Sequence, residues 1–119
     1  MTVARGPSLL ARDLAATRRF YRMLGFVVSG GDGAEEWLEL RRGDAVIQFY
    51  IRPPHDTPTA PCLSGALYIS SHDVDSLAEQ LRDKVAVEWG PETMHYGMRE
   101  LAVRDPNGYL IAFTAPASP

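Results

Sequence analysis

Residues 99–113 read RELAVRDPNGYLIAF, in which two strand-like segments flank a turn. Apolar residues alternate with polar or small ones from 99 to 104, and a second apolar run fills 109–113. Between them, Asp105-Pro106-Asn107-Gly108 is typical of a tight turn, because proline fixes its own φ and glycine tolerates a positive φ. The stretch therefore predicts a β-hairpin in the second half of the chain.

The first half of the chain carries a matching hairpin signature. Segments 37–41 and 45–51 are rich in strand-forming residues and flank a short turn, Arg42-Gly43-Asp44. Ile47-Gln48-Phe49 then recurs as Ile111-Ala112-Phe113, 64 positions later. An internal repeat of this kind predicts two copies of one supersecondary unit.

Each half also carries one predicted helix that begins after an aspartate. Asp13 is a good N-cap for residues 14–24, whose apolar side chains recur at helical spacing, and Gly25 is placed to end the helix. Asp73, 60 positions after Asp13, caps a second such helix from residue 74 to about 84. Further strands are expected at residues 26–29, 66–70 and 87–89, with a loop from 90 to 97. The chain is therefore predicted to be an α+β protein of two βαβββ modules.

Length and the placement of prolines bound the domain organisation. With 119 residues, of which 45% are hydrophobic, the chain is long enough for one compact domain and too short for two. Prolines gather between residues 53 and 61, which predicts a stiff linker at the midpoint. We expect a single domain over residues 1–119, with module one at about 7–52, the linker at 53–63 and module two at about 64–115.

Charge and hydropathy argue against several classes of protein. The formal net charge of −3 disfavours nucleic acid as a partner, because nucleic-acid binding needs a basic surface. No apolar run is long enough for a membrane helix, the first residues lack the apolar core of a signal peptide, and the lone Cys62 allows no intrachain disulfide. A cytoplasmic protein is therefore expected. Arg99 is expected to form a surface ion pair with Glu100 or Asp105 rather than to bind a ligand.

The chain resembles the vicinal oxygen chelate superfamily, which includes glyoxalase I, extradiol dioxygenases, and fosfomycin and bleomycin resistance proteins. The likeness lies in the opening run, Arg12-Asp13-Leu14 with Phe20-Tyr21 and Leu24-Gly25-Phe26, and in the closing Asp-Pro-Asn-Gly turn. It extends from about Ser8 to Thr114. The run Tyr96-Gly97-Met98-Arg99-Glu100 is most similar to the bleomycin resistance branch.

In the metal-dependent branches of that superfamily, His and Glu ligands come from the first and last strands of each module. The resemblance places those positions on Gly6 or Pro7, on Gln48, on Ala66 and on Ala112. Only Gln48 carries a donor atom, and one neutral amide oxygen is a poor site for a divalent cation. We therefore expect no metal ion and no other cofactor.

The histidines and serines do not supply a replacement site. His55 lies in the proline-rich linker, His72 before a predicted helix and His95 in the loop after Trp89, with no ligand spacing between any two. The chain has no Gly-x-Ser-x-Gly elbow and no phosphate-binding glycine loop. No catalytic residue is predicted, so a binding protein is favoured over an enzyme.

A ligand pocket is predicted from the alternation of side chains along the strands. Because residues two apart share a face, taking Gln48, Ala66 and Ala112 as inward brings Tyr50 and Tyr68 to the same side. The two alanines are expected to leave room for a ligand. The alternative is that these side chains only fill the space between the strands.

Two tryptophans beside acidic residues indicate the class of ligand. Glu35 and Glu36 precede Trp37, and Glu88 precedes Trp89. Aromatic faces beside carboxylates suit a flat cationic molecule, although tryptophan is more often a core residue. The predicted ligand-binding residues are Trp37, Gln48, Tyr50, Tyr68, Trp89, His95, Tyr96 and Met98.

These features predict a metal-independent binding protein of the bleomycin resistance type. The resemblance implies a homodimer that sequesters a flat small molecule, cationic or hydrophobic, such as an antibiotic, with modules able to exchange across the linker. Two alternatives stay open. One is a metalloenzyme of glyoxalase or dioxygenase type with an atypical site at Glu39, Gln48 or His95. The other is a small-molecule sensor or a partner subunit.

Overall fold

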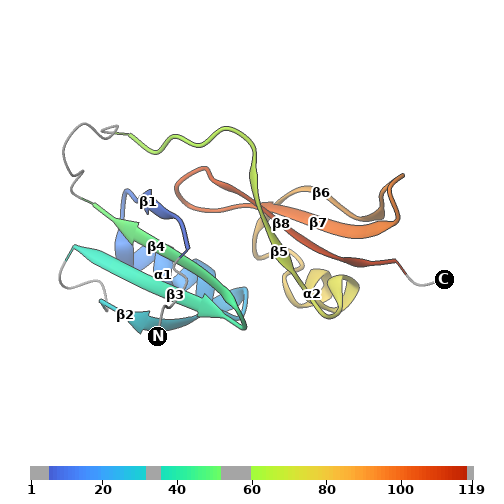
Figure 1. Cartoon of the computed structure of the whole chain (residues 1–119), viewed down its shortest axis with the longest axis horizontal. Coiled ribbons are helices and arrows are strands. Elements are labelled where there is room, and N and C mark those ends of the chain that lie inside the picture. Colours follow the sequence, from blue (N-terminus) through green and yellow to red (C-terminus); the bar gives the residue numbers. More distant parts are fainter. Residues whose placement is uncertain (1–5, 32–35, 52–59, 118–119) are drawn as a thin grey trace. The chain divides into compact units, whose positions relative to one another are not determined.

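The computed structural model describes residues 6–31, 36–51 and 60–117, whose course is shown in Figure 1. The first half contains β1 (Ser8–Leu10), α1 (Leu14–Met23), β2 (Val27–Gly30), β3 (Trp37–Arg42) and β4 (Ala45–Tyr50). The second half contains β5 (Ala66–Ser70), α2 (Val74–Gln80), β6 (Ala86–Thr93), β7 (Met98–Arg104) and β8 (Leu110–Pro116). The chain divides into two compact units, Met1–Cys62 and Leu63–Pro119.

The two units share one topology. Each is a four-stranded sheet with one helix, with strand order β1-β4-β3-β2 in the first unit and β5-β8-β7-β6 in the second. The first strand of each unit runs parallel to the last, and the other neighbouring strands are antiparallel. The prediction of an α+β protein with two βαβββ modules is confirmed, while the boundaries drawn for a single domain stay a prediction.

The core of the first unit lies between α1 and the sheet. Leu38 and Phe49 are register partners on β3 and β4, and both are fully buried. The ring of Tyr21, from α1, packs against that of Phe49 with centroids 5.2 Å apart. Since successive residues of a strand face opposite sides, Glu39 and Gln48 lie on the side of the sheet away from α1.

The second unit repeats this packing with α2. Leu101 and Phe113 are fully buried register partners on β7 and β8, and Val74 and Leu77 of α2 are buried as well. Each such apolar side chain contributes about 1.5–3 kcal/mol when it leaves water. Glu100, the neighbour of Leu101, therefore points to the opposite side, away from α2.

Both helices begin with the same cap. The Asp13 carboxylate accepts a hydrogen bond from the Ala16 N–H at 3.1 Å, and that of Asp73 accepts one from the Ser76 N–H at 3.0 Å. Gly25 follows α1 with a φ of 96°, which is the left-handed conformation expected where a helix stops. Neither helix within the described ranges has the length and apolar character needed to cross a membrane.

The closing turn forms as the sequence predicts. Oδ1 of Asp105 accepts hydrogen bonds from the Asn107 N–H at 2.9 Å and from the Tyr109 N–H at 2.8 Å. The Gly108 N–H donates to the Asp105 carbonyl at 3.0 Å, and Gly108 has a φ of 90°. Asp105 thus holds together the turn between β7 and β8.

The largest differences from the sequence-based expectation are at the ends of α2 and β6. α2 ends at Gln80 rather than near residue 84, because the chain turns at 81–84, where Asp83 has a φ of 63°. β6 extends to Thr93 and takes up part of the predicted loop from 90 to 97, because register shifts on both sides of Trp89 let the strand continue. Most of the predicted linker, including His55, lies outside the described residues.

Candidate functional site

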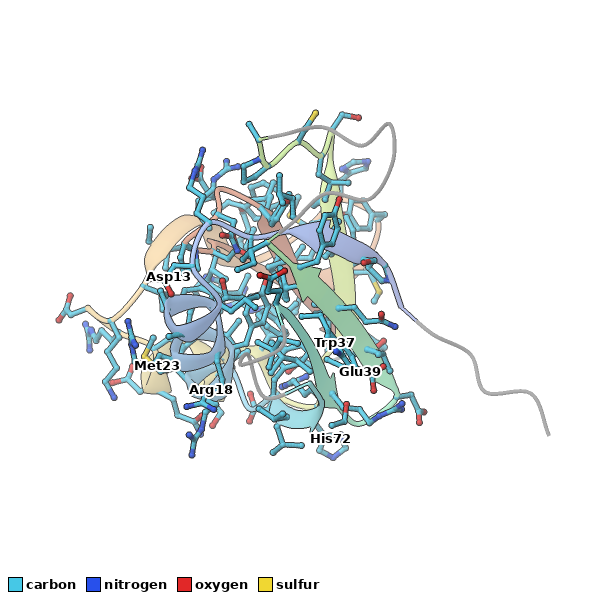
Figure 2. All side chains as sticks on the ribbon, turned by 90° about the vertical axis from the view of Figure 1, so that its left-hand side faces the viewer. Asp13, Arg18, Met23, Trp37, Glu39 and His72 are labelled. Carbon is cyan, nitrogen blue, oxygen red and sulfur yellow. The ribbon has the colours of Figure 1, made fainter. Side chains whose placement is uncertain are left out.

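The side of the first sheet that faces away from α1 carries three predicted ligand-binding residues, and we call it the first face. Trp37 and Tyr50 are register partners across β3 and β4, and Glu39 and Gln48 form the next pair on the same face. Figure 2 shows Trp37 and Glu39 on this side, with Asp13, the N-cap of α1, across the unit. The first face therefore combines two aromatic rings, an amide and a carboxylate.

Glu39 on this face has partners for its charge. Its Oε1 atom accepts a hydrogen bond from the Ser29 hydroxyl at 2.8 Å and lies 3.9 Å from Nη2 of Arg41. Only 8% of the residue is exposed. A nearby guanidinium and a hydroxyl donor compensate a carboxylate that has lost most of its water.

Trp37 lies directly against two glycines. A Cβ atom at Gly30 would be 2.9 Å from Cη2 of Trp37, and one at Gly31 would be 2.7 Å from its Cδ2. Gly31 also has a φ of 64°, which disfavours any other residue. The two glycines thus make room for the indole, and part of that ring is committed to packing within the unit.

The corresponding side of the second sheet, away from α2, is the second face. Its register partners form one row across the four strands: Tyr68, Ala112, Ala102 and Trp89. Tyr68 is 58% exposed, whereas both alanines are fully buried. The expectation of open room above Ala112 is therefore wrong, since a methyl group without exposed surface has other atoms packed against it.

Glu100 shares this face and is only 1% exposed. The Trp89 Nε1–H donates a hydrogen bond to its Oε2 atom at 3.3 Å, and the Tyr96 hydroxyl donates one to Oε1. The bond to Glu100 raises the pKa of Tyr96 well above its usual range, and burial and the nearby Tyr68 add to the rise. We call Tyr68, Trp89, Tyr96 and Glu100 the Glu100 cluster.

Arg99 belongs to the opposite side of the sheet. Its Nη2 atom lies 2.8 Å from Oδ1 of Asp75 on α2, and its Nη1 donates to the Thr93 hydroxyl at 3.3 Å. The expectation that Arg99 pairs with Glu100 or Asp105 is wrong. Glu100 points to the opposite side of β7, and the Asp105 carboxylate accepts hydrogen bonds from the Asn107 and Tyr109 N–H groups in the turn. The hydrogen bond from Arg99 lowers the pKa of the Asp75 carboxyl.

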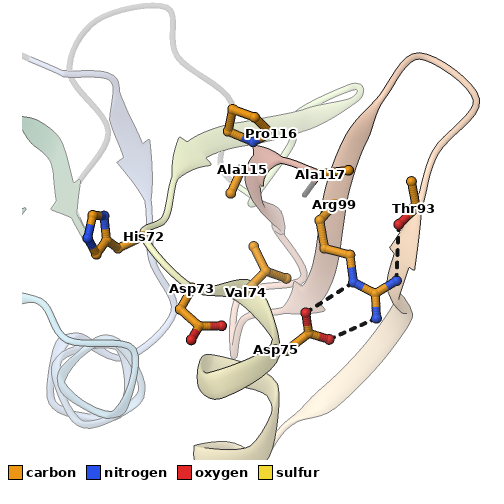
Figure 3. A pocket seen from close by; sticks show the side chains of 9 residues that line it. All are labelled: His72, Asp73, Val74, Asp75, Thr93, Arg99, Ala115, Pro116 and Ala117. Atoms are coloured by element: carbon orange, nitrogen blue, oxygen red, sulfur yellow. Dashed lines mark hydrogen bonds and ion pairs between the residues drawn. The ribbon is translucent and has the colours of Figure 1, made fainter. Parts of the chain in front are cut away.

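A polar hollow of about 570 Å³ lies beside this ion pair, and Figure 3 shows the residues around it. Arg99 and Asp75 are among its lining residues and are bonded to each other across it. His72, at its rim, is exposed. The hollow lies next to α2 and does not include any residue of the Glu100 cluster.

Glu88 is also engaged elsewhere. Its Oε1 atom lies 3.0 Å from Nε of Arg104, in an ion pair that is about two-fifths exposed on each side. The sequence suggested Glu88 as the acid next to Trp89. The acid that contacts the Trp89 side chain is Glu100 instead.

The remaining predicted residues lie beside the Glu100 cluster. His95 is exposed, with its ring centroid 5.0 Å from that of Tyr96. Met98 is half-buried and two residues from Glu100, so it shares the second face. Glu100 is absent from the predicted residues, although strand parity places it on the same face as Met98.

Comparison with known proteins identifies the family. Residues 4–113 match the sequence profile of the Glyoxalase/Bleomycin resistance protein/Dioxygenase superfamily. The chain belongs to this superfamily. No curated protein matches its sequence.

Several solved structures resemble this superfamily member. A bleomycin resistance determinant encoded on the transposon Tn5 is 26% identical, with a TM-score of 0.68 over 97% of this chain and 98% of that chain. A bleomycin-binding protein in complex with bleomycin is 24% identical, with a TM-score of 0.68 over 95% and 98%. A virulence protein from Salmonella typhimurium is 21% identical, with a TM-score of 0.71 over 96% of both chains. The resemblance noted in the sequence is thus confirmed.

The metal positions of the Glyoxalase/Bleomycin resistance protein/Dioxygenase superfamily do not fit a metal ion in the first unit. β1 begins at Ser8, the register partner of Gln48, so Gly6 and Pro7 both precede the strand. A Cβ atom at Gly6 would lie 1.5 Å from the Val46 carbonyl oxygen, so no side chain is possible there. Pro7 has no donor atom in its side chain.

The second unit offers no ligands at these positions either, because both are alanines, Ala66 and Ala112. Within the described ranges, no three His, Cys, Asp or Glu residues come together in a way that could hold a metal ion. Gln48 and its register partner Glu39 provide two oxygen donors, fewer than hard cations require. At these positions, all of them among the described residues, this member of the superfamily therefore does not have the donors that the superfamily's metal requires.

Proposed function

We propose that the protein binds a flat small molecule, cationic or hydrophobic, without a metal ion and without changing it chemically. One observation carries the proposal. In each unit, a tryptophan and at least one tyrosine lie with a buried carboxylate on the sheet face away from the helix. Aromatic rings stack on planar ligands, and carboxylates attract positive charge.

The comparisons support this reading. The bleomycin resistance determinant of Tn5 covers nearly the whole chain at 26% identity. We therefore propose sequestration of the bleomycin resistance type, with an antibiotic or a similarly flat cation as ligand. The missing donors at the superfamily's metal positions favour this function over a glyoxalase-like or dioxygenase-like reaction.

A titration of tryptophan emission tests the proposal. The protein is stripped of metal with a chelator and titrated with metal-free bleomycin, and the titration is repeated with added Zn²⁺ or Ni²⁺. We expect a saturable change without metal, at one ligand per subunit. A change that appears only after metal is added would contradict the proposal and favour a metalloenzyme with an atypical site.

We propose further that the chain forms one domain and pairs as a homodimer. A domain of this size hides a limited share of its surface, and closed two-fold dimers are the commonest assembly of small proteins. Sedimentation equilibrium should then give twice the chain mass of 13.1 kDa. A particle of single-chain mass at micromolar concentration would show that pairing is not needed.

A further inference from the structure

The Glu100 carboxylate is buried, and none of the described residues pairs with it as a cation. Its two partners, the Trp89 N–H at 3.3 Å and the Tyr96 hydroxyl, are both neutral, and no Lys, Arg or His among the described residues forms an ion pair with it. The two arginines of β7 pair with Asp75 and Glu88. A carboxylate out of water is normally compensated by a positive charge, and the part of the chain that the structure describes does not supply one here.

The groups around Glu100 are suited to a positively charged nitrogen. Tyr68 is 58% exposed and Tyr96 is 51% exposed, so their rings are accessible to a ligand. The Trp89 indole, which donates to the same carboxylate, is half-buried. Aromatic faces attract ammonium and other organic cations, and a carboxylate adds an ion pair. A neutral planar molecule would gain binding free energy from contacts with the aromatic rings but not from an ion pair with Glu100.

We propose that the Glu100 cluster binds the positively charged group of the ligand. In the complex, this cationic group replaces the Tyr96 hydroxyl beside the Glu100 carboxylate. The inference deepens the proposed function and rests on it. It assigns the charge-recognising role to the second unit and to Glu100 rather than to the acids next to the tryptophans in the sequence. The ligand class is a planar aromatic cation.

The Tyr96 side chain can rotate away from Glu100 without opening its turn. Its turn is closed by backbone bonds, from the Met94 N–H to the Met98 carbonyl at 2.8 Å and from the Gly97 N–H to the Met94 carbonyl at 3.0 Å. The side chain of Tyr96 takes no part in these bonds, so it can rotate while the turn stays closed. The hydroxyl remains a proton donor over the ordinary pH range, because its hydrogen bond to Glu100 raises its pKa.

The test uses two probes of the same shape and different charge. The cation is 1-methylquinolinium, and 1-methylnaphthalene is its neutral counterpart. Binding of both to the full chain is measured by equilibrium dialysis. We expect the wild-type protein to bind the cation at least about tenfold more tightly than the hydrocarbon, which corresponds to about 1.4 kcal/mol.

Three variants test whether Glu100 is the residue that recognises the positive charge of the probe. Glu100→Gln keeps the size and acceptor capacity of the side chain and should lower the affinity for the cation about tenfold, with the hydrocarbon within twofold. Glu88→Gln makes the same change in net charge at a residue paired with Arg104, and should leave both affinities unchanged. Tyr96→Phe removes the competing hydroxyl and should raise the affinity for the cation severalfold.

Several results would overturn the inference. If Glu100→Gln lowers the affinity for both probes equally, Glu100 has a packing role. If Glu100→Gln and Glu88→Gln lower the affinity for the cation equally, the effect comes from the protein's long-range electrostatic field. If Glu100→Gln does not unfold cooperatively, Tyr96→Phe decides alone, and a loss or no change in cation affinity refutes displacement. Bleomycin binding by a protein that does not distinguish the probes would leave the proposed function standing. A protein that binds neither bleomycin nor either probe would refute both this inference and the proposed function.

Discussion

Replacing Asp105 with alanine tests whether one side chain holds the turn between β7 and β8. Oδ1 of Asp105 accepts from two backbone N–H groups, those of Asn107 at 2.9 Å and Tyr109 at 2.8 Å, and all three residues are buried. A buried donor left without an acceptor costs about 1–3 kcal/mol. Pro106 and Gly108 are exposed, so water can reach part of the turn. We therefore expect Asp105→Ala to lower the free energy of unfolding by about 2–4 kcal/mol.

Urea unfolding followed by tryptophan emission measures this loss. With an m-value of about 1–3 kcal/mol per molar urea, the midpoint should fall by roughly 1 M or more. Asp44→Ala is the matched control, because Asp44 is the exposed acid of the turn between β3 and β4 and should change stability by less than about 0.5 kcal/mol. Asp105→Asn keeps an acceptor oxygen and should lose less than Asp105→Ala. Equal midpoints for the alanine variants at positions 105 and 44 would refute the reasoning.

Three further outcomes follow from the packing of single side chains. Gly30→Ala puts a Cβ atom 2.9 Å from the Trp37 ring, so the emission of Trp37 should shift to the red and stability should fall by about 1–3 kcal/mol; an unchanged spectrum would argue against this contact. Asp73→Ala removes the cap of α2 and should cost about 1 kcal/mol in urea unfolding, whereas no loss would mean that the cap is dispensable. The pKa of Tyr96 is raised by its bond to Glu100, so this bond stabilises the fold below pH of about 10 and the contribution is lost as pH rises through the raised pKa. The difference in alkaline absorbance between wild type and Tyr96→Phe should show this late ionisation, and Glu100→Gln should return it to the ordinary range.

The fold was predictable where local chemistry is repeated. Asp13 and Asp73 cap their helices through the same contact, to the N–H three residues later, and this contact follows from residue type and position alone. The limits of β6 were not predictable, because Gly90-Pro91 interrupts its strand pattern, and only pairing with β7 across two register shifts carries the strand on to Thr93. Tertiary pairing outweighs a local interruption there.

The site was predictable as far as strand parity reaches. Tyr68 and Ala112 share a face, as do Gln48 and Tyr50, because the period of a strand is fixed. Ion pairs were not predictable from adjacency. The partner of Arg99 is Asp75, 24 residues away, because the fold brings α2 against β7 on that side of the sheet.

The two units share one fold, but the residues at corresponding positions of their two faces differ. Tyr50 and Thr114 occupy corresponding positions on the last strands, and their register partners are Trp37 in the first unit and Glu100 in the second. The carboxylate of the first face, Glu39, is instead one pair further along and already has Arg41 at 3.9 Å. Under our proposal, a cationic ligand gains more from Glu100, because the described residues that donate to this carboxylate, Trp89 and Tyr96, are neutral. Our proposal therefore places the recognition of positive charge at Glu100 in the second unit and not at Glu39 in the first.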